Sequence, residues 1–133
     1  MLKVRGIEHV AWAVHDIDAA LVKLRDLFGI EPAHREYVES QKTEAALLPA
    51  GESNLELIAP KGNESLARFL DKRGSSLHHI ALEVDDLAAA LEVLRRAGVR
   101  LVDDAPRIGS RGHKVAFVHP AATGGLLVEL VEK

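Results

Sequence analysis

The sequence predicts an α+β domain made of two βαβββ modules that together form one curved mixed sheet. The first observation behind this prediction is an internal repeat: residues 7–16 match residues 77–86, with identical or similar side chains at most positions. The second is that each copy changes from alternating to helical periodicity after an acidic N-cap candidate, Asp16 or Asp86. Two copies are too few for a solenoid, so the repeat indicates a duplicated module.

Each module is expected to contain one helix and four strands. The opening strand leads into a stripe of apolar residues at helical spacing, which ends at Gly29 in the first copy and Gly98 in the second. Short strand-like segments complete each copy. They cover residues 33–39, 43–49 and 53–59 in the first module, and residues 100–103, 113–119 and 125–131 in the second.

The whole chain, residues 1–133, is predicted to be a single domain in which both modules are needed. The first module covers residues 1–60 and the second covers residues 77–133. Residues 61–76 form a linker that is expected to contain a short helix at 65–72.

Composition excludes several classes of protein. The formal net charge of −3 disfavours a nucleic-acid partner, because such proteins usually carry a basic patch. The absence of cysteine excludes disulfides, thiolate metal sites and a cysteine nucleophile. No long apolar run suggests a membrane partner, so a soluble cytoplasmic protein is expected.

Strand alternation selects two of the seven histidines. Val10, Trp12 and Val14 are expected to face the helix, which turns His9 to the opposite side of the sheet. His79 occupies the matching position in the second copy. The other five histidines are expected to be structural or solvated.

A glutamate stands inside an apolar run of each closing strand, Glu56 in the first module and Glu129 in the second. A buried carboxylate is costly unless it is paired, protonated or bound to a metal. One His and one Glu from each half therefore suggest a shared site for a divalent ion, with imidazole and carboxylate ligands. The alternative for any one of these residues alone is a satisfied core histidine or a solvent-facing glutamate.

The arrangement resembles the vicinal-oxygen-chelate superfamily, which includes glyoxalases, bleomycin-resistance proteins and dioxygenases. Within it, four segments look most like the methylmalonyl-CoA epimerase family. They are residues 77–86, residues 107–112, the His-Pro pair at 119–120 and the glycine-rich ending at 123–130. The resemblance covers essentially the whole chain and implies a glyoxalase-like fold around a central metal site.

The resemblance implies an isomerase that interconverts the 2R and 2S epimers of methylmalonyl-CoA through an enolate. It implies His9, Glu56, His79 and Glu129 as metal ligands, with Co²⁺ first and Zn²⁺, Mn²⁺, Ni²⁺ or Mg²⁺ as alternatives. Inversion needs one group to remove a proton and another to return it. By resemblance these groups are Glu44 and Glu129, and the protein is expected to be a homodimer with an acyl-CoA substrate.

A basic stretch supplies candidates for binding the phosphates of coenzyme A. Arg107, Arg111 and Lys114 lie in and beside a basic loop, which would serve this role if it lines the mouth of the pocket. A solvated loop is the simpler interpretation of the same residues.

Other functions use the same ligand set. A glyoxalase I-type lyase also isomerises its substrate at a metal site, but the loop sequences favour the epimerase. A metal-free small-molecule-binding protein of the same fold would be expected to lack these ligands. A ring-cleaving dioxygenase would usually have two His and one Glu, so the additional Glu56 argues against it.

Overall fold

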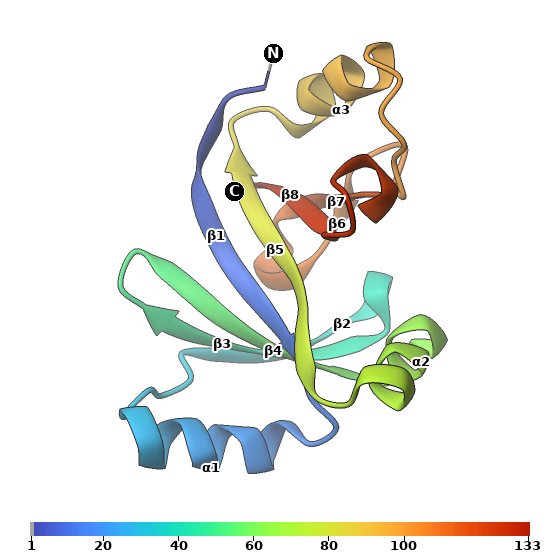
Figure 1. Cartoon of the computed structure of the whole chain (residues 1–133). Coiled ribbons are helices and arrows are strands. Elements are labelled where there is room, and N and C mark those ends of the chain that lie inside the picture. The colour runs from blue at the N-terminus through green and yellow to red at the C-terminus, as the bar shows by residue number, and fades with distance from the viewer. Residues whose placement is uncertain (1) are drawn as a thin grey trace. The chain divides into compact units, whose positions relative to one another are not determined.

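The duplication seen in the sequence appears as two similar sets of four strands, each packed against the helix that follows its first strand (Figure 1). The structure is a computed structural model that describes residues 2–133. Unit 1 comprises residues 2–8 and 79–133, and unit 2 comprises residues 9–78. The chain passes from one unit to the other inside two strands, β1 (Val4–Ala13) and β5 (Ser76–Val84).

In unit 2 the strand order is β2-β3-β4-β1. The β2–β3 and β3–β4 pairs are antiparallel, and β4 runs parallel to β1. The elements are α1 (Ile17–Phe28), β2 (His34–Val38), β3 (Thr43–Ala50), β4 (Ser53–Pro60) and α2 (Glu64–Arg73). Asp16 caps α1 by accepting a hydrogen bond from the Ala19 N–H, as the sequence predicts.

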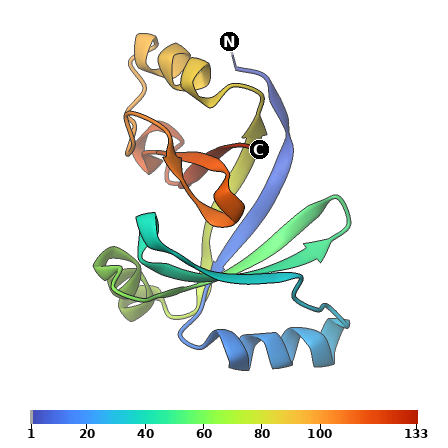
Figure 2. The ribbon, with the colours of Figure 1, turned by 180° about the vertical axis from the view of Figure 1, so that it is seen from behind.

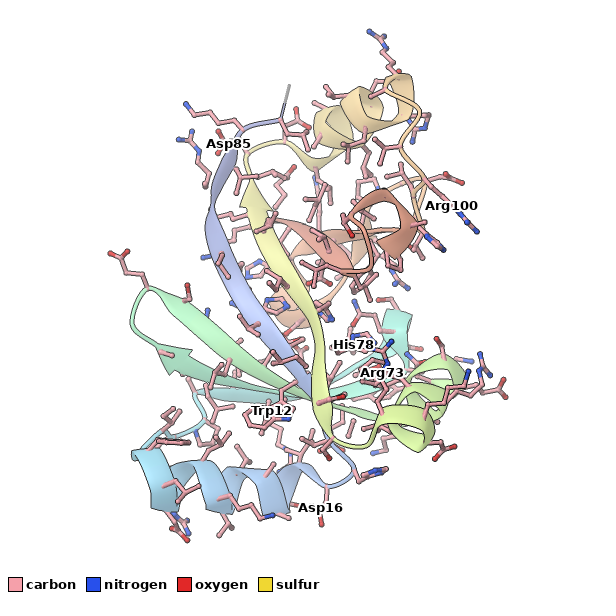
Figure 3. All side chains as sticks on the ribbon, viewed as in Figure 1. Trp12, Asp16, Arg73, His78, Asp85 and Arg100 are labelled. Carbon is pink, nitrogen blue, oxygen red and sulfur yellow. The ribbon has the colours of Figure 1, made fainter. Side chains whose placement is uncertain are left out.

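The two faces of the unit 2 sheet are covered by different helices (Figure 2). Trp12 packs between β1 and α1, where it joins an apolar cluster that contains Val14 (Figure 3). Ala11 and Ala13 face the other way, into a cluster with Leu66 and Leu70 of α2. The predicted phase of β1 is therefore confirmed, and the linker helix covers part of the face that carries His9.

In unit 1 the strand order is β5-β8-β7-β6, with a parallel β5–β8 pair and antiparallel β8–β7 and β7–β6 pairs. The elements that follow β5 are α3 (Leu87–Arg96), β6 (Arg107–Ile108), β7 (Lys114–Val118) and β8 (Val128–Glu132). Asp86 caps α3 as Asp16 caps α1. Leu82 and Val84 pack with α3, which confirms the phase predicted for β5.

The register of the strands repeats between the units. Ala11 pairs with Glu56 in unit 2, and Ala81 pairs with Glu129 in unit 1. Residues that align in the two sequence copies thus occupy the same place in each sheet. The duplication extends to hydrogen-bond register, which places each glutamate beside a strand that carries a histidine.

Two strand predictions for the second module are wrong in detail. Residues 100–103 form no strand; Leu101 makes only an isolated bridge to Val118. The Phe117 N–H donates a hydrogen bond to the Asp103 carboxylate at 2.7 Å. A side chain therefore takes the place of the backbone carbonyl that a neighbouring strand would offer to this N–H. The last strand begins at Val128 instead of residue 125, after a turn with positive φ at two glycines.

The linker helix is confirmed and is slightly longer than predicted, Glu64–Arg73 instead of 65–72. Within residues 2–133, none of the helices combines the length and apolarity needed to span a bilayer.

Candidate active site

Unit 2 holds a buried pair formed by His9 and Glu56. Their side chains are 4% and 6% exposed, and His9 Nε2 lies 3.7 Å from Glu56 Oε1. Both project from the face on which Ala11 packs, because His9 lies two residues before Ala11 and Glu56 is its cross-strand partner. The separation is longer than a hydrogen bond between nitrogen and oxygen.

Unit 1 holds the equivalent pair, His79 and Glu129. Their side chains are each 4% exposed, and His79 Nε2 lies 3.7 Å from Glu129 Oε1. Phe117, the cross-strand partner of Glu129, packs edge-on against the His79 ring at a centroid distance of 5.0 Å. This packing holds the imidazole in place, a role that the sequence does not reveal.

The chemistry of the two pairs fits a divalent metal ion. Bonds of about 2.0–2.2 Å from an ion to an imidazole nitrogen and a carboxylate oxygen separate the two donors by roughly 3–4 Å. Burial also favours a bound cation, because an isolated carboxylate loses its hydration inside a protein. Each pair therefore combines an imidazole and a carboxylate, the donor types that suit Co²⁺, Mn²⁺, Ni²⁺ or Zn²⁺.

Glu44 lies on the other face of unit 2. Its cross-strand partner on β4 is Ala59, which packs with α1. Glu44 Oε1 accepts hydrogen bonds from Arg35 Nε at 2.8 Å and Arg35 Nη2 at 2.5 Å, and Arg35 Nη1 donates to Asp18 of α1 at 2.5 Å. The two carboxylates, Asp18 first, raise the pKa of the Arg35 guanidinium above its usual value. The structure does not bring Glu44 to the face of Glu56, and its catalytic role stays a prediction.

Two of the three cations predicted to bind coenzyme A phosphates have close acidic neighbours. Arg107 Nε lies 3.5 Å from Asp103, and its guanidinium lies over the Phe117 ring. Lys114 Nζ lies 3.4 Å from Glu132. Their charges are thus partly balanced inside unit 1, and their phosphate-binding role also stays a prediction.

The third cation, Arg111, forms an ion pair with the buried Glu8 that is not predicted from the sequence. Its Nη2 and Nη1 atoms donate to the Glu8 carboxylate at 2.6 and 3.2 Å, and the Glu8 side chain is completely buried. Arg111 adopts a left-handed conformation with φ 58°, which is unusual for a residue with a side chain. Lys133 adds a second positive charge 3.8 Å from Glu8. No local pattern indicates this pair, because its members lie 103 residues apart.

Two of the remaining histidines have structural roles, as predicted for this group. His119 Nδ1 accepts the Ala121 N–H at 3.0 Å and so caps a short turn. The His78 ring packs edge-on against Phe69 of α2, with a centroid distance of 4.8 Å.

Comparisons with known proteins agree with the fold and the repeat. Residues 8–117 match the family model of the Glyoxalase/Bleomycin resistance protein/Dioxygenase superfamily. The chain is 35% identical to the ethylmalonyl-CoA/methylmalonyl-CoA epimerase of Cereibacter sphaeroides, over 93% of this chain and 95% of that protein.

Solved structures of related proteins superpose on nearly the whole chain. The crystal structure of methylmalonyl-CoA epimerase from Mycobacterium tuberculosis superposes with a TM-score of 0.92 at 39% identity, covering 99% of this chain and 92% of that one. A methylmalonyl-CoA epimerase in complex with methylmalonyl-CoA and NH4+ gives a TM-score of 0.93 at 35% identity, covering 98% and 96%. The predicted glyoxalase-like fold is confirmed, and the chain belongs to the glyoxalase/bleomycin resistance/dioxygenase superfamily as a homologue of methylmalonyl-CoA epimerases.

Proposed function

We propose that the protein interconverts the 2R and 2S epimers of methylmalonyl-CoA. The observation that carries this proposal is the pair of matched, buried His–Glu sets, one in each repeat, in a chain whose relatives include epimerases of this thioester. The C2 proton of the substrate lies between a thioester and a carboxylate. Its removal therefore leaves a negative charge that oxygen atoms can share.

In this proposal His9, Glu56, His79 and Glu129 hold one divalent ion. Burial and donor type support the assignment, and His9, His79 and Glu129 are a candidate ligand group. Co²⁺ is the ion that the resemblance favours. When bound, the ion supplies Lewis-acid stabilisation of the charge that develops on the substrate oxygens.

Glu129 is proposed to move a proton as well as to bind the ion. A carboxylate has two oxygens, so one can act as a ligand while the other faces the substrate. The second acid/base group is Glu44. Oε1 of Glu44 accepts both hydrogen bonds from Arg35, and Oε2 accepts no hydrogen bond from a residue in 2–133. Oε2 is therefore the atom that would accept a proton. Because Glu44 lies on the α1 face of β3, opposite His9 and Glu56, this role requires a rearrangement that brings its carboxylate to C2 of the bound substrate.

We also propose that the protein is a homodimer, as the resemblance implies, and that it is cytoplasmic, as expected from its composition. Sedimentation velocity measures the mass of the assembly directly. A species of two chains at micromolar concentration is the expected result, and a single chain at all concentrations contradicts it.

A glyoxalase I-type lyase is the competing function, because its chemistry uses the same ligand types. Metal-reconstituted protein is expected to convert (2R)-methylmalonyl-CoA to the 2S epimer. In parallel, methylglyoxal and glutathione should give no lactoylglutathione. Formation of lactoylglutathione at comparable efficiency would contradict the epimerase assignment.

A further inference from the structure

Three strands of unit 1, β5, β8 and β7, build the face that carries His79 and Glu129 in layers. Phe117 joins these two residues in the first layer, since it is the cross-strand partner of Glu129 and packs against the His79 ring. Alternate residues of a strand share a face, so the residues two positions away form a second layer on the same side. This second layer is the buried apolar cluster of Ala81, Val115 and Val131.

The connection between β6 and β7 rests on the second layer. A Cβ atom at Gly109 would lie 2.7 Å from Val115 Cγ2, so this close approach requires glycine at position 109. The Gly109 N–H donates to the His113 carbonyl at 2.8 Å, and the His113 N–H donates to the Ser110 carbonyl at 3.2 Å. Residues 109–113 are therefore a tight turn that lies against Val115.

An ion pair holds this turn in place. Arg111, at its centre, donates to the completely buried Glu8 carboxylate through Nη2 at 2.6 Å and Nη1 at 3.2 Å. The left-handed backbone of Arg111, with φ 58°, is unfavourable for a residue with a side chain and persists only where the surrounding contacts impose it. Desolvation of two buried charges offsets much of their attraction, so such a pair is better explained by the geometry that it fixes than by stability alone.

Glu8 connects the turn to β1 and β5. His9 directly follows Glu8 along β1, so the paired hydrogen bonds from Arg111 fix the backbone at the residue before a proposed metal ligand. Lys133 Nζ lies 3.8 Å from Glu8 and 3.5 Å from Glu83, which shares a strand and a face with His79. The ion pair is thus the centre of a charged network at the end of the face that carries His79 and Glu129.

We infer that Glu8 and Arg111 are positioning residues for the proposed metal ligands. The inference rests on the proposed function. Arg111 acts through the backbone of β1 next to His9, and through the packing of the turn on Val115. Groups that orient ligands before an ion arrives raise the affinity for that ion, because less freedom is lost on binding. Glu8 and Arg111 need no contact with the ion or the substrate for this role.

The test replaces the ion pair by apolar side chains in the full chain. E8M/R111M removes both charges together, so neither is left unpaired and the fold is expected to be retained, which circular dichroism verifies. The matched control is R5M/D85M, which makes the same change at the exposed ion pair of unit 1. Calorimetry measures Co²⁺ affinity after removal of metal by a chelator, and the visible absorption of bound Co²⁺ reports its coordination geometry.

E8M/R111M is expected to bind Co²⁺ about tenfold more weakly and with an altered absorption spectrum. The control should stay within about twofold of the unchanged protein and keep its spectrum. Arg111→Lys keeps the charge opposite Glu8 but not the paired donors, so it should weaken Co²⁺ binding by a smaller factor, about threefold. This second variant tests the inference even if the first fails to fold.

The outcomes separate the inference from the function on which it rests. If the unchanged protein binds Co²⁺ and epimerises methylmalonyl-CoA, but both Arg111 variants keep its affinity and spectrum, the inference is wrong while the function stands. An equal loss of affinity in the control also overturns the inference. Calorimetry with coenzyme A runs in parallel: weaker coenzyme A binding by the Arg111 variants, with Co²⁺ binding unchanged, would assign Arg111 to the phosphates instead. An unchanged protein that binds no divalent ion overturns both.

Discussion

Glu44 and Glu56 project from opposite faces of the antiparallel β3–β4 pair. Glu56 faces Leu47 across the pair, whereas Glu44 faces Ala59. Alternate residues of a strand point to opposite sides, so an odd spacing between Glu44 and Leu47 separates the two carboxylates. One face carries the His9–Glu56 pair, and the other carries the network of Glu44, Arg35 and Asp18. Substitutions at the two glutamates are therefore expected to have separable effects.

Glu44→Gln is expected to leave metal content unchanged and to abolish exchange of the C2 proton. The proposed ligands His9 and Glu56 lie on the other face of unit 2, and glutamine lacks a carboxylate to accept a proton. Metal analysis and proton exchange by NMR measure the two effects. Asp18→Asn is the control, because it removes the charge of the other carboxylate that Arg35 contacts. This variant should keep most of the activity. Full exchange in the glutamine variant would show that Glu44 serves only as a partner of Arg35.

His9→Ala and His79→Ala are each expected to lose stoichiometric metal. Each change removes one proposed ligand and leaves a buried carboxylate without its neighbour. Elemental analysis after dialysis against a weak chelator gives the metal content. His119→Ala, which removes a structural histidine, should retain the ion. Retention of one ion per chain by both of the first two variants would rule out this site.

Arg111→Gln is expected to destabilise the fold by about 3–5 kcal/mol, because the completely buried Glu8 would lose its main counter-charge. Urea unfolding followed by circular dichroism measures the change. The exposed Arg5–Asp85 pair provides a control, since its side chains are 48% and 59% exposed and Arg5→Gln should change stability little. Equal losses of unfolding free energy at Arg5 and Arg111 would show that the Glu8–Arg111 pair stabilises the fold no more than an exposed pair does.

Stability is expected to fall as the pH drops from 7 to 5, in part because of His113. Burial, followed by the charge of Arg111, lowers the pKa of His113 below its usual value. Below about pH 6.5 the unfolded chain binds a proton that the folded protein resists, so the free energy of unfolding decreases. His113→Asn should make the dependence of stability on pH shallower over this range. An unchanged slope in urea titrations at several pH values would contradict the assignment.

The sequence predicts most of the fold because duplication turns a weak pattern into a repeated one. A strand histidine or glutamate alone says little, but His9 and His79 recur at matching positions, and the register of Glu56 and Glu129 repeats too. Strand phase then follows from alternation, which depends only on neighbouring residues.

What the sequence does not reveal depends on contacts between distant residues. The Glu8–Arg111 pair joins positions 103 residues apart, and no local signal indicates it. Residues 100–103 have the composition of a strand, yet the Asp103 carboxylate bonds to the Phe117 N–H. In both cases a polar side chain binds a partner that is distant in the sequence, and the hydrophobic periodicity of the chain does not indicate such contacts.

In the proposed function, two buried His–Glu pairs support metal-dependent proton transfer at C2 of methylmalonyl-CoA. The most direct measurement incubates metal-reconstituted protein with (2R)-methylmalonyl-CoA in deuterium oxide and follows C2 by NMR, with and without a chelator. Deuterium is expected at C2 in both epimers, and exchange is expected to be lost when the metal is removed. The absence of deuterium from C2 in the metal-loaded protein, or exchange that is unaffected by metal removal, would contradict it.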